Sequence, residues 1–70
     1  MAITVSYAIE EAIKACGSQR VLAEKAGVSQ AAISKYLRGV MIPTGVTAKK
    51  LSEATGGLLK PSDFAPHIFD

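Results

Sequence analysis

The chain has 70 residues and a formal net charge of +2, and 49% of its residues are hydrophobic. This length suits one small domain, and the hydrophobic content excludes an intrinsically disordered chain. No apolar run approaches the roughly 20 residues of a membrane-spanning helix, and Glu10 and Glu11 near the start argue against a secretory signal. We therefore expect a single cytoplasmic domain, residues 1–70, with no membrane contact.

Cys16 is the only cysteine and His67 the only histidine. One cysteine cannot form an intrachain disulfide, and neither residue has the neighbours that a metal site or a nucleophile–base pair requires. Cys16 follows Ala12 and Ile13 at helical spacing, which favours a small buried side chain over a reactive thiol. We expect no enzyme activity, no metal site and no cofactor.

Helical periodicity and end signals predict four main helices. The first three are expected over residues 5–16, 19–26 and 30–38, each preceded by a Ser or Thr cap and followed by glycine. The fourth should begin at Thr44 or Gly45 and run through Ala54, after Pro43 has interrupted the chain. Pro61 suits the first position of one further helical turn.

Basic residues are concentrated in the middle of the chain. Residues 18–50 hold six basic side chains and one acidic one, whereas residues 1–17 and 51–70 are each weakly acidic. A basic segment between acidic ends can attract phosphates, but a solvated surface has the same charge pattern. Charge alone leaves both interpretations open.

The expected third helix has two unlike faces. The apolar face can pack on the first two helices and consists of Ala32, Ile33, Tyr36 and Leu37. The opposite face mixes amide, hydroxyl, methyl and cationic groups and consists of Gln30, Ala31, Ser34, Lys35 and Arg38. Such groups can contact base edges in the major groove, where an acid would be repelled by the phosphates. An ordinary solvated face would usually include glutamate, so the absence of glutamate is evidence for DNA reading, and the face alone leaves a solvated surface as the alternative.

The segment QRVLAEKAGVSQAAISKYLRG, residues 19–39, resembles the helix-turn-helix of the Cro and CI repressors of phages. The resemblance depends on residues at fixed spacing, namely Gln19, Ala23, Gly27, Val28, Ser29 and Ile33. Residues 42–64 look like the tail of small YdaS- or Cro-like regulators. The resemblance implies an all-α, lambda-repressor-like domain of four to five short helices, with the helix-turn-helix at about residues 19–38. It also implies a phage or prophage transcriptional repressor that binds a double-stranded DNA operator.

The same resemblance implies a role for individual side chains. The residues expected to read bases are Gln30, Ala31, Ser34, Lys35 and Arg38. Ala31 stands where a polar residue is frequent, so it can offer only a methyl contact. Gln19 is expected to contact a phosphate and to support Gln30. Further phosphate contacts are expected from Arg20, Ser29, Tyr36 and Lys49, and Lys49 can equally be a solvated side chain.

A single recognition helix reads few base pairs, so the resemblance implies a homodimer, formed in solution or only on DNA. Residues 40–45 and the apolar tail, with Phe64, Ile68 and Phe69, are the candidate dimer contacts, although the tail side chains can instead pack in the core. An alternative function is an antitoxin-like regulator that acts mainly by binding a protein partner, but the short extension beyond the motif argues against it. The expected location is the cytoplasm of a bacterial host cell, with nucleoid association.

Overall fold

The first four helices each begin at a side chain that accepts a hydrogen bond from the first turn. The computed structural model describes residues 4–66, in which the helices are α1 (Val5–Cys16), α2 (Gln19–Ala26), α3 (Gln30–Leu37), α4 (Gly45–Ala54) and α5 (Pro61–Phe64). The capping oxygens accept from amides three residues later at 3.1–3.3 Å and belong to Thr4, Ser18, Ser29 and Thr44. These bonds satisfy amides that a helix N-terminus otherwise leaves unpaired.

Most helix bounds confirm the sequence predictions. α1 and α2 have the predicted bounds, α4 begins at Gly45, and α5 is a single turn with Pro61 in its first position. The third helix is one residue shorter than predicted, because it ends at Leu37 and Arg38 is its C-cap. Gly39 follows in a left-handed conformation, with φ of 76°, and closes that end.

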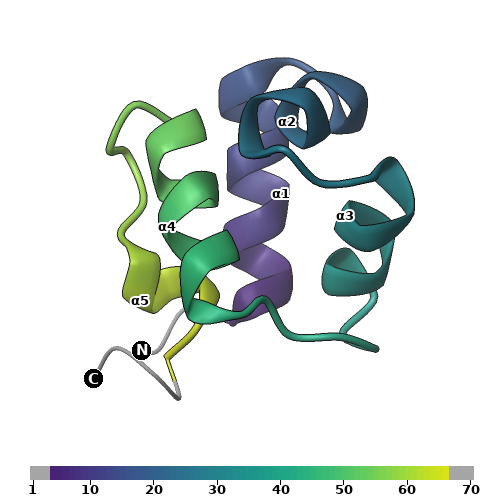
Figure 1. Cartoon of the computed structure of the whole chain (residues 1–70), viewed down its shortest axis with the longest axis vertical. Coiled ribbons are helices and arrows are strands. Elements are labelled where there is room, and N and C mark those ends of the chain that lie inside the picture. The colour runs from purple at the N-terminus through teal and green to yellow at the C-terminus, as the bar shows by residue number, and fades with distance from the viewer. Residues whose placement is uncertain (1–3, 67–70) are drawn as a thin grey trace.

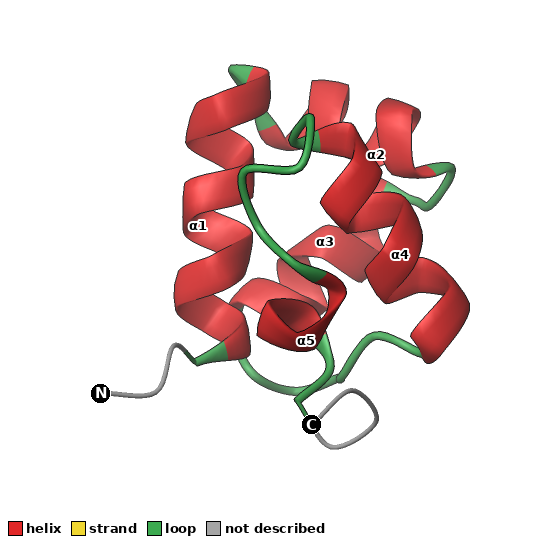
Figure 2. Cartoon of the chain, turned by 90° about the vertical axis from the view of Figure 1, so that its left-hand side faces the viewer, coloured by secondary structure: helices red, strands yellow, loops and turns green. Residues whose placement is uncertain are grey.

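The helices of residues 4–66 surround a common hydrophobic core. α1 runs through the centre, with α3 on one side and α4 and α5 on the other, and α2 packs against α1, α3 and α4 (Figure 1). The turned view shows α5 in front of the space between α1 and α4, both of which it contacts (Figure 2). The largest fully buried helical side chains are Ile9, Leu22, Ile33, Leu51 and Phe64. Every helix therefore contributes at least one large side chain to the core, which holds the helices together.

Phe64 is fully buried, which confirms the interpretation of this side chain as core. The loop before it is fastened to α4, because the buried hydroxyl of Ser52 donates to the carbonyl of Leu59 at 2.6 Å. Ile68 and Phe69, the other members of the expected apolar tail, lie outside the described residues. Within residues 4–66, no helix is long and apolar enough to cross a bilayer.

Candidate nucleic-acid interface

α2 and α3 are joined by a three-residue turn whose shape depends on Gly27. This glycine has φ of 69° and ψ of 32°, a left-handed conformation that glycine adopts without steric cost. Its amide donates to the carbonyl of Glu24 at 3.3 Å, and the amide of Val28 donates to the carbonyl of Ala23 at 3.0 Å. Val28 is half-buried against the core, and Ser29 then caps α3. The turn thus closes α2 and starts α3 in a new direction.

The inner face of α3 anchors this helix to the rest of the domain. Ile33 is fully buried and Tyr36 is 5% exposed, while Ala32 and Leu37 are half-buried against the same core. The hydroxyl of Ser6 on α1 donates a hydrogen bond to the carbonyl of Leu37. A carbonyl in the last turn has no partner within its own helix, so this bond satisfies it and fastens the end of α3 to α1.

The outer face of α3 carries the five residues predicted to read bases. Gln30, Ala31, Lys35 and Arg38 are exposed, and Ser34 is half-buried. The helix contains no acidic residue. Its eight residues span about 12 Å at a rise of 1.5 Å per residue. An α-helix with its side chains is about 10–12 Å in diameter, and the major groove of B-DNA is about 12 Å wide, so an exposed helix such as α3 can fit in it.

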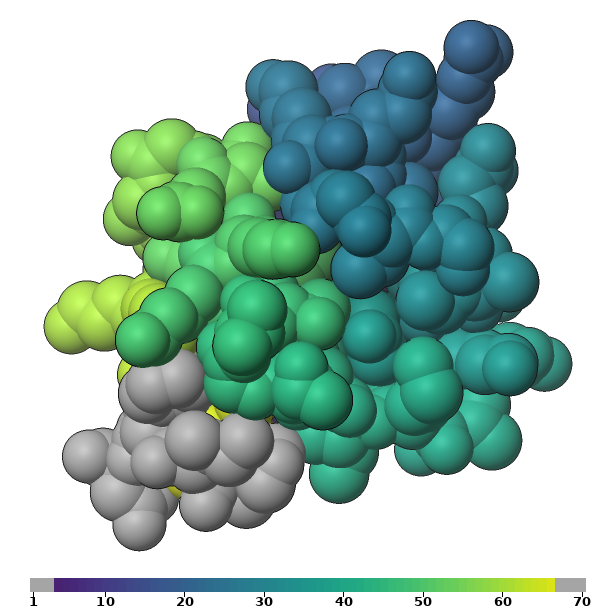
Figure 3. Space-filling view, viewed as in Figure 1, coloured from purple at the N-terminus to yellow at the C-terminus, as the bar shows by residue number. Residues whose placement is uncertain are grey.

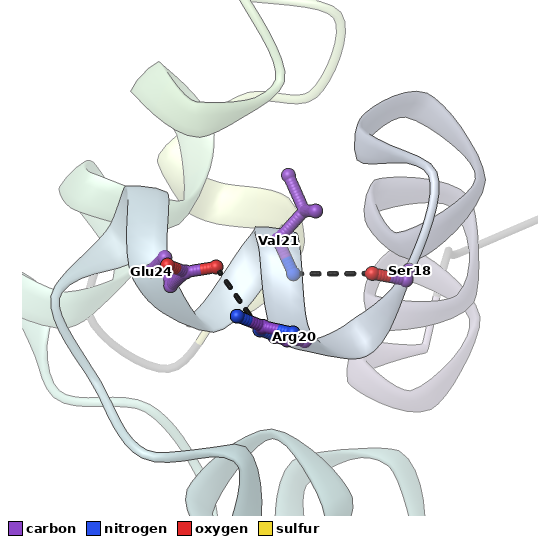
Figure 4. Close-up of polar contacts among 4 residues, drawn as sticks. All are labelled: Ser18, Arg20, Val21 and Glu24. Atoms are coloured by element: carbon purple, nitrogen blue, oxygen red, sulfur yellow. Dashed lines mark hydrogen bonds and ion pairs between the residues drawn. The ribbon is translucent and has the colours of Figure 1, made fainter.

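The N-terminus of α2 holds two of the residues predicted to contact phosphate. Gln19 opens the helix and is half-buried, whereas Arg20 is exposed. Figure 4 shows Arg20 directed toward Glu24, with 3.6 Å between Nε and Oε1, beside the cap bond from the Val21 amide to Ser18. This ion pair was not among the sequence predictions, although the i, i+4 spacing of Arg20 and Glu24 is a signal for it. Both side chains are mostly exposed, so Arg20 can exchange Glu24 for a phosphate at little cost.

The other residues predicted to contact phosphate have different surroundings. Ser29 is exposed, and its hydroxyl oxygen is occupied as the cap acceptor, with the hydroxyl hydrogen available to donate. Lys49 is exposed on α4, outside the helix-turn-helix. Tyr36 belongs to the core, so only its hydroxyl could meet a phosphate. The structure thus places Arg20 and Ser29 at the starts of α2 and α3, and Tyr36 and Lys49 elsewhere.

Neither Cys16 nor the acidic side chains of residues 4–66 form a metal-binding cluster. The half-buried thiol of Cys16 donates to the carbonyl of Ala54, with 3.4 Å between sulfur and oxygen. Among residues 4–66, no group of three or more His, Cys, Asp or Glu side chains could hold a metal ion.

The arrangement defines a class of protein. Residues 4–66 form helices without strands, the second and third helices meet at a short glycine turn, and the third presents a polar face. This is the fold of a lambda-repressor-like helix-turn-helix domain, found in DNA-binding regulators.

A family model described as helix-turn-helix matches residues 9–59, from the middle of α1 to the loop before α5. The chain belongs to this helix-turn-helix family, which is one of DNA-binding regulatory domains. The searches of curated proteins and of solved structures found no match.

Proposed function

We propose that this protein is a sequence-specific transcriptional repressor of the Cro type, encoded by a phage or prophage. It acts in the cytoplasm of the bacterial host, at the nucleoid, as one domain of residues 1–70 without a cofactor. The observation that carries the proposal is the outer face of α3, which is polar, acid-free and exposed on a helix whose other face is anchored in the core. On this proposal α3 lies in the major groove of an operator.

Each side chain of the outer face suits a particular base edge. The amide of Gln30 can donate to and accept from adenine, and the cations of Lys35 and Arg38 suit the acceptors of guanine. The methyl group of Ala31 can contact thymine, and the hydroxyl of Ser34 can donate or accept. On this proposal, Gln30, Ser34 and Lys35 carry most of the discrimination between base pairs.

Phosphate contacts would position α3 in the groove. The N-termini of α2 and α3 present backbone amides and the positive ends of the helix dipoles, which favour phosphate oxygens. Gln19 and Arg20 flank the first of these sites and Ser29 lies at the second. The remaining proposed phosphate contacts come from Lys49 and from the hydroxyl of Tyr36.

A helix that reads a few base pairs cannot specify a unique operator, so we propose a homodimer on two half-sites. Half-sites for a helix-turn-helix dimer lie about 34–36 Å apart, which is one turn of DNA. This spacing places both copies of α3 on the same side of the duplex.

The test is enrichment of the preferred duplex from a random library with the full chain, followed by titration of two variants. Gln30→Ala should lower discrimination at one base position by about 1–3 kcal/mol. Arg20, unlike Gln19, has no predicted role in supporting Gln30, so Arg20→Ala should remove only a phosphate contact and weaken binding to enriched and scrambled duplexes equally. Equal losses on both duplexes for Gln30→Ala would contradict the base-reading role.

A further inference from the structure

The last turn of α3 is completed by a hydrogen bond from outside the helix-turn-helix. Two backbone bonds of 3.1 and 3.0 Å close this turn, and they run from Gly39 to Tyr36 and from Val40 to Lys35. With the left-handed Gly39 they form a Schellman motif. Among residues 4–66, no backbone amide donates to the next carbonyl, that of Leu37. The hydroxyl of Ser6 donates to it instead.

Ser6 is held on a fixed support. It is half-buried as the second residue of α1, and Ile9, one turn later, is fully buried. α1 packs against each of the other four helices. Ser6 also precedes residues 9–59, the part of the chain that matches the family model, so the match assigns it no role.

The hydrogen bond from Ser6 adds direction to the packing of α3. Ile33 and Tyr36 hold the inner face by apolar contacts, which have no preferred direction. A hydrogen bond weakens steeply away from linearity, so the bond to Leu37 restricts rotation of the last turn. The side chains of a helix reach about 5–6 Å from its axis, so a rotation of about 10° moves them by about 1 Å. Donor–acceptor distances span only about 2.7–3.2 Å, so such a shift disrupts a contact to a base.

This bond acts at one end of the outer face. Leu37 is next to Arg38 and follows Lys35 within the same turn. Gln30 opens the helix, about 10 Å from Leu37 at a rise of 1.5 Å per residue. In the space-filling view α3, in teal, lies at the right-hand edge of the molecule and is open to solvent (Figure 3). A change at Leu37 should therefore reach Lys35 and Arg38 before it reaches Gln30.

We propose that Ser6 is a positioning residue for DNA reading, because its bond to the carbonyl of Leu37 orients the last turn of α3 and hence Lys35 and Arg38. This inference rests on the proposed function. It extends the residues that determine specificity to α1, which contacts no base in the proposed complex. A good contact to a base edge contributes about 5–150-fold to discrimination, and loss of the Ser6 bond forfeits part of that factor.

The experiment compares Ser6→Ala with Ser52→Ala in the full chain. Ser52 is the matched control, because its buried hydroxyl also donates to a distant carbonyl, that of Leu59, at 2.6 Å and away from α3. Duplexes are enriched with the wild type, and single alanine variants then assign the base positions read by Gln30, Lys35 and Arg38. Binding is measured where circular dichroism shows each variant to be folded.

Ser6→Ala should lower discrimination by at least about threefold at the positions of Lys35 and Arg38, and leave that of Gln30 unchanged. Ser52→Ala should leave discrimination unchanged at every position. Ser6→Thr keeps the hydroxyl and should keep the wild-type discrimination. In an Arg38→Ala background, Ser6→Ala should cause no further loss at the position of Arg38, because the contact that it orients is already gone.

Several outcomes would overturn the inference. One is unchanged discrimination in Ser6→Ala, and another is the absence of any base position assigned to Lys35 or Arg38. An equal loss at the position of Gln30, or in Ser52→Ala, would show a general effect of stability. A loss in Ser6→Thr as large as that in Ser6→Ala would show that the hydroxyl is not the cause.

If the wild type enriches no duplex, the proposed function fails separately. Amide hydrogen exchange then decides whether Ser6 orients the last turn of α3. The inference requires faster exchange of the Gly39 and Val40 amides in Ser6→Ala and not in Ser52→Ala. Equal exchange in the wild type and Ser6→Ala would contradict it.

Discussion

Replacing Gly27 by alanine should lower the free energy of unfolding by about 1 kcal/mol, because the turn between α2 and α3 requires a left-handed residue. Gly27 has φ of 69° and ψ of 32°. For a residue with a Cβ, this conformation costs about 1–2 kcal/mol. A Cβ built on Gly27 has no atom within 4 Å beyond its neighbours, so no steric term is added. Alanine also restricts the unfolded chain, which offsets about 0.4–1 kcal/mol of the loss.

The measurement is urea unfolding followed by far-ultraviolet circular dichroism, with thermal unfolding as a second readout. In a domain of this size a loss of 1 kcal/mol corresponds to a fall in Tm of about 4–8 °C. The slope of free energy against urea should be unchanged, since the variant exposes the same surface on unfolding. Gly27→Asn is the control. Its free energy of unfolding should fall less than that of Gly27→Ala, because asparagine tolerates the left-handed region.

Two results would refute this reasoning. A variant as stable as the wild type would mean that Gly27 does not need a left-handed conformation. A loss above about 3 kcal/mol would require a clash or a lost contact at a position where the structure shows open space.

Three further substitutions test the cap, the core and the ion pair. Ser29→Ala removes the oxygen that caps α3, so it should lower the free energy of unfolding by about 1 kcal/mol. Urea unfolding should show this loss as a lower midpoint. Phe64→Ala empties a fully buried site and should cost about 3–5 kcal/mol of the unfolding free energy, out of roughly 4–10 kcal/mol for a chain of 70 residues. Calorimetry should therefore show a greatly lowered Tm. Glu24→Gln releases Arg20 and removes an acid beside the proposed phosphate site, so fluorescence anisotropy should show a few-fold tighter binding to all duplexes at low salt.

Each of these substitutions has a control that isolates its cause. Ser29→Asp keeps a capping oxygen and should retain stability, and a loss equal to that of alanine would contradict the cap. Leu58→Ala removes an exposed side chain and should cost far less than Phe64→Ala; equal costs would contradict the burial of Phe64. Glu53→Gln removes an exposed acid on α4, and an equal gain in DNA affinity would show a general charge effect in place of a local one.

The helix-turn-helix could be predicted from the sequence alone, because the signals that set its helix ends are local. A cap such as Ser18 acts on an amide three residues later, and Gly27 ends a helix through bonds that reach back at most five residues. Signals of this range can be read without knowledge of the fold, so the bounds of α2 and the start of α3 were predicted to the residue. The division of α3 into two faces follows from the helical period alone, and the burial of Ile33 opposite the exposed Lys35 confirms it.

Only the tertiary structure decided which side chains the assembled helices cover. The bond from Ser6 to Leu37 joins residues 31 positions apart, and neither residue carries a local signal for it. The burial of Pro43 leaves its neighbour Ile42 exposed, although both belong to one short apolar run. Phe64 could have been core or interface until α1 and α4 were placed against α5. Burial depends on where distant segments pack, and periodicity records only the order of residues within one segment.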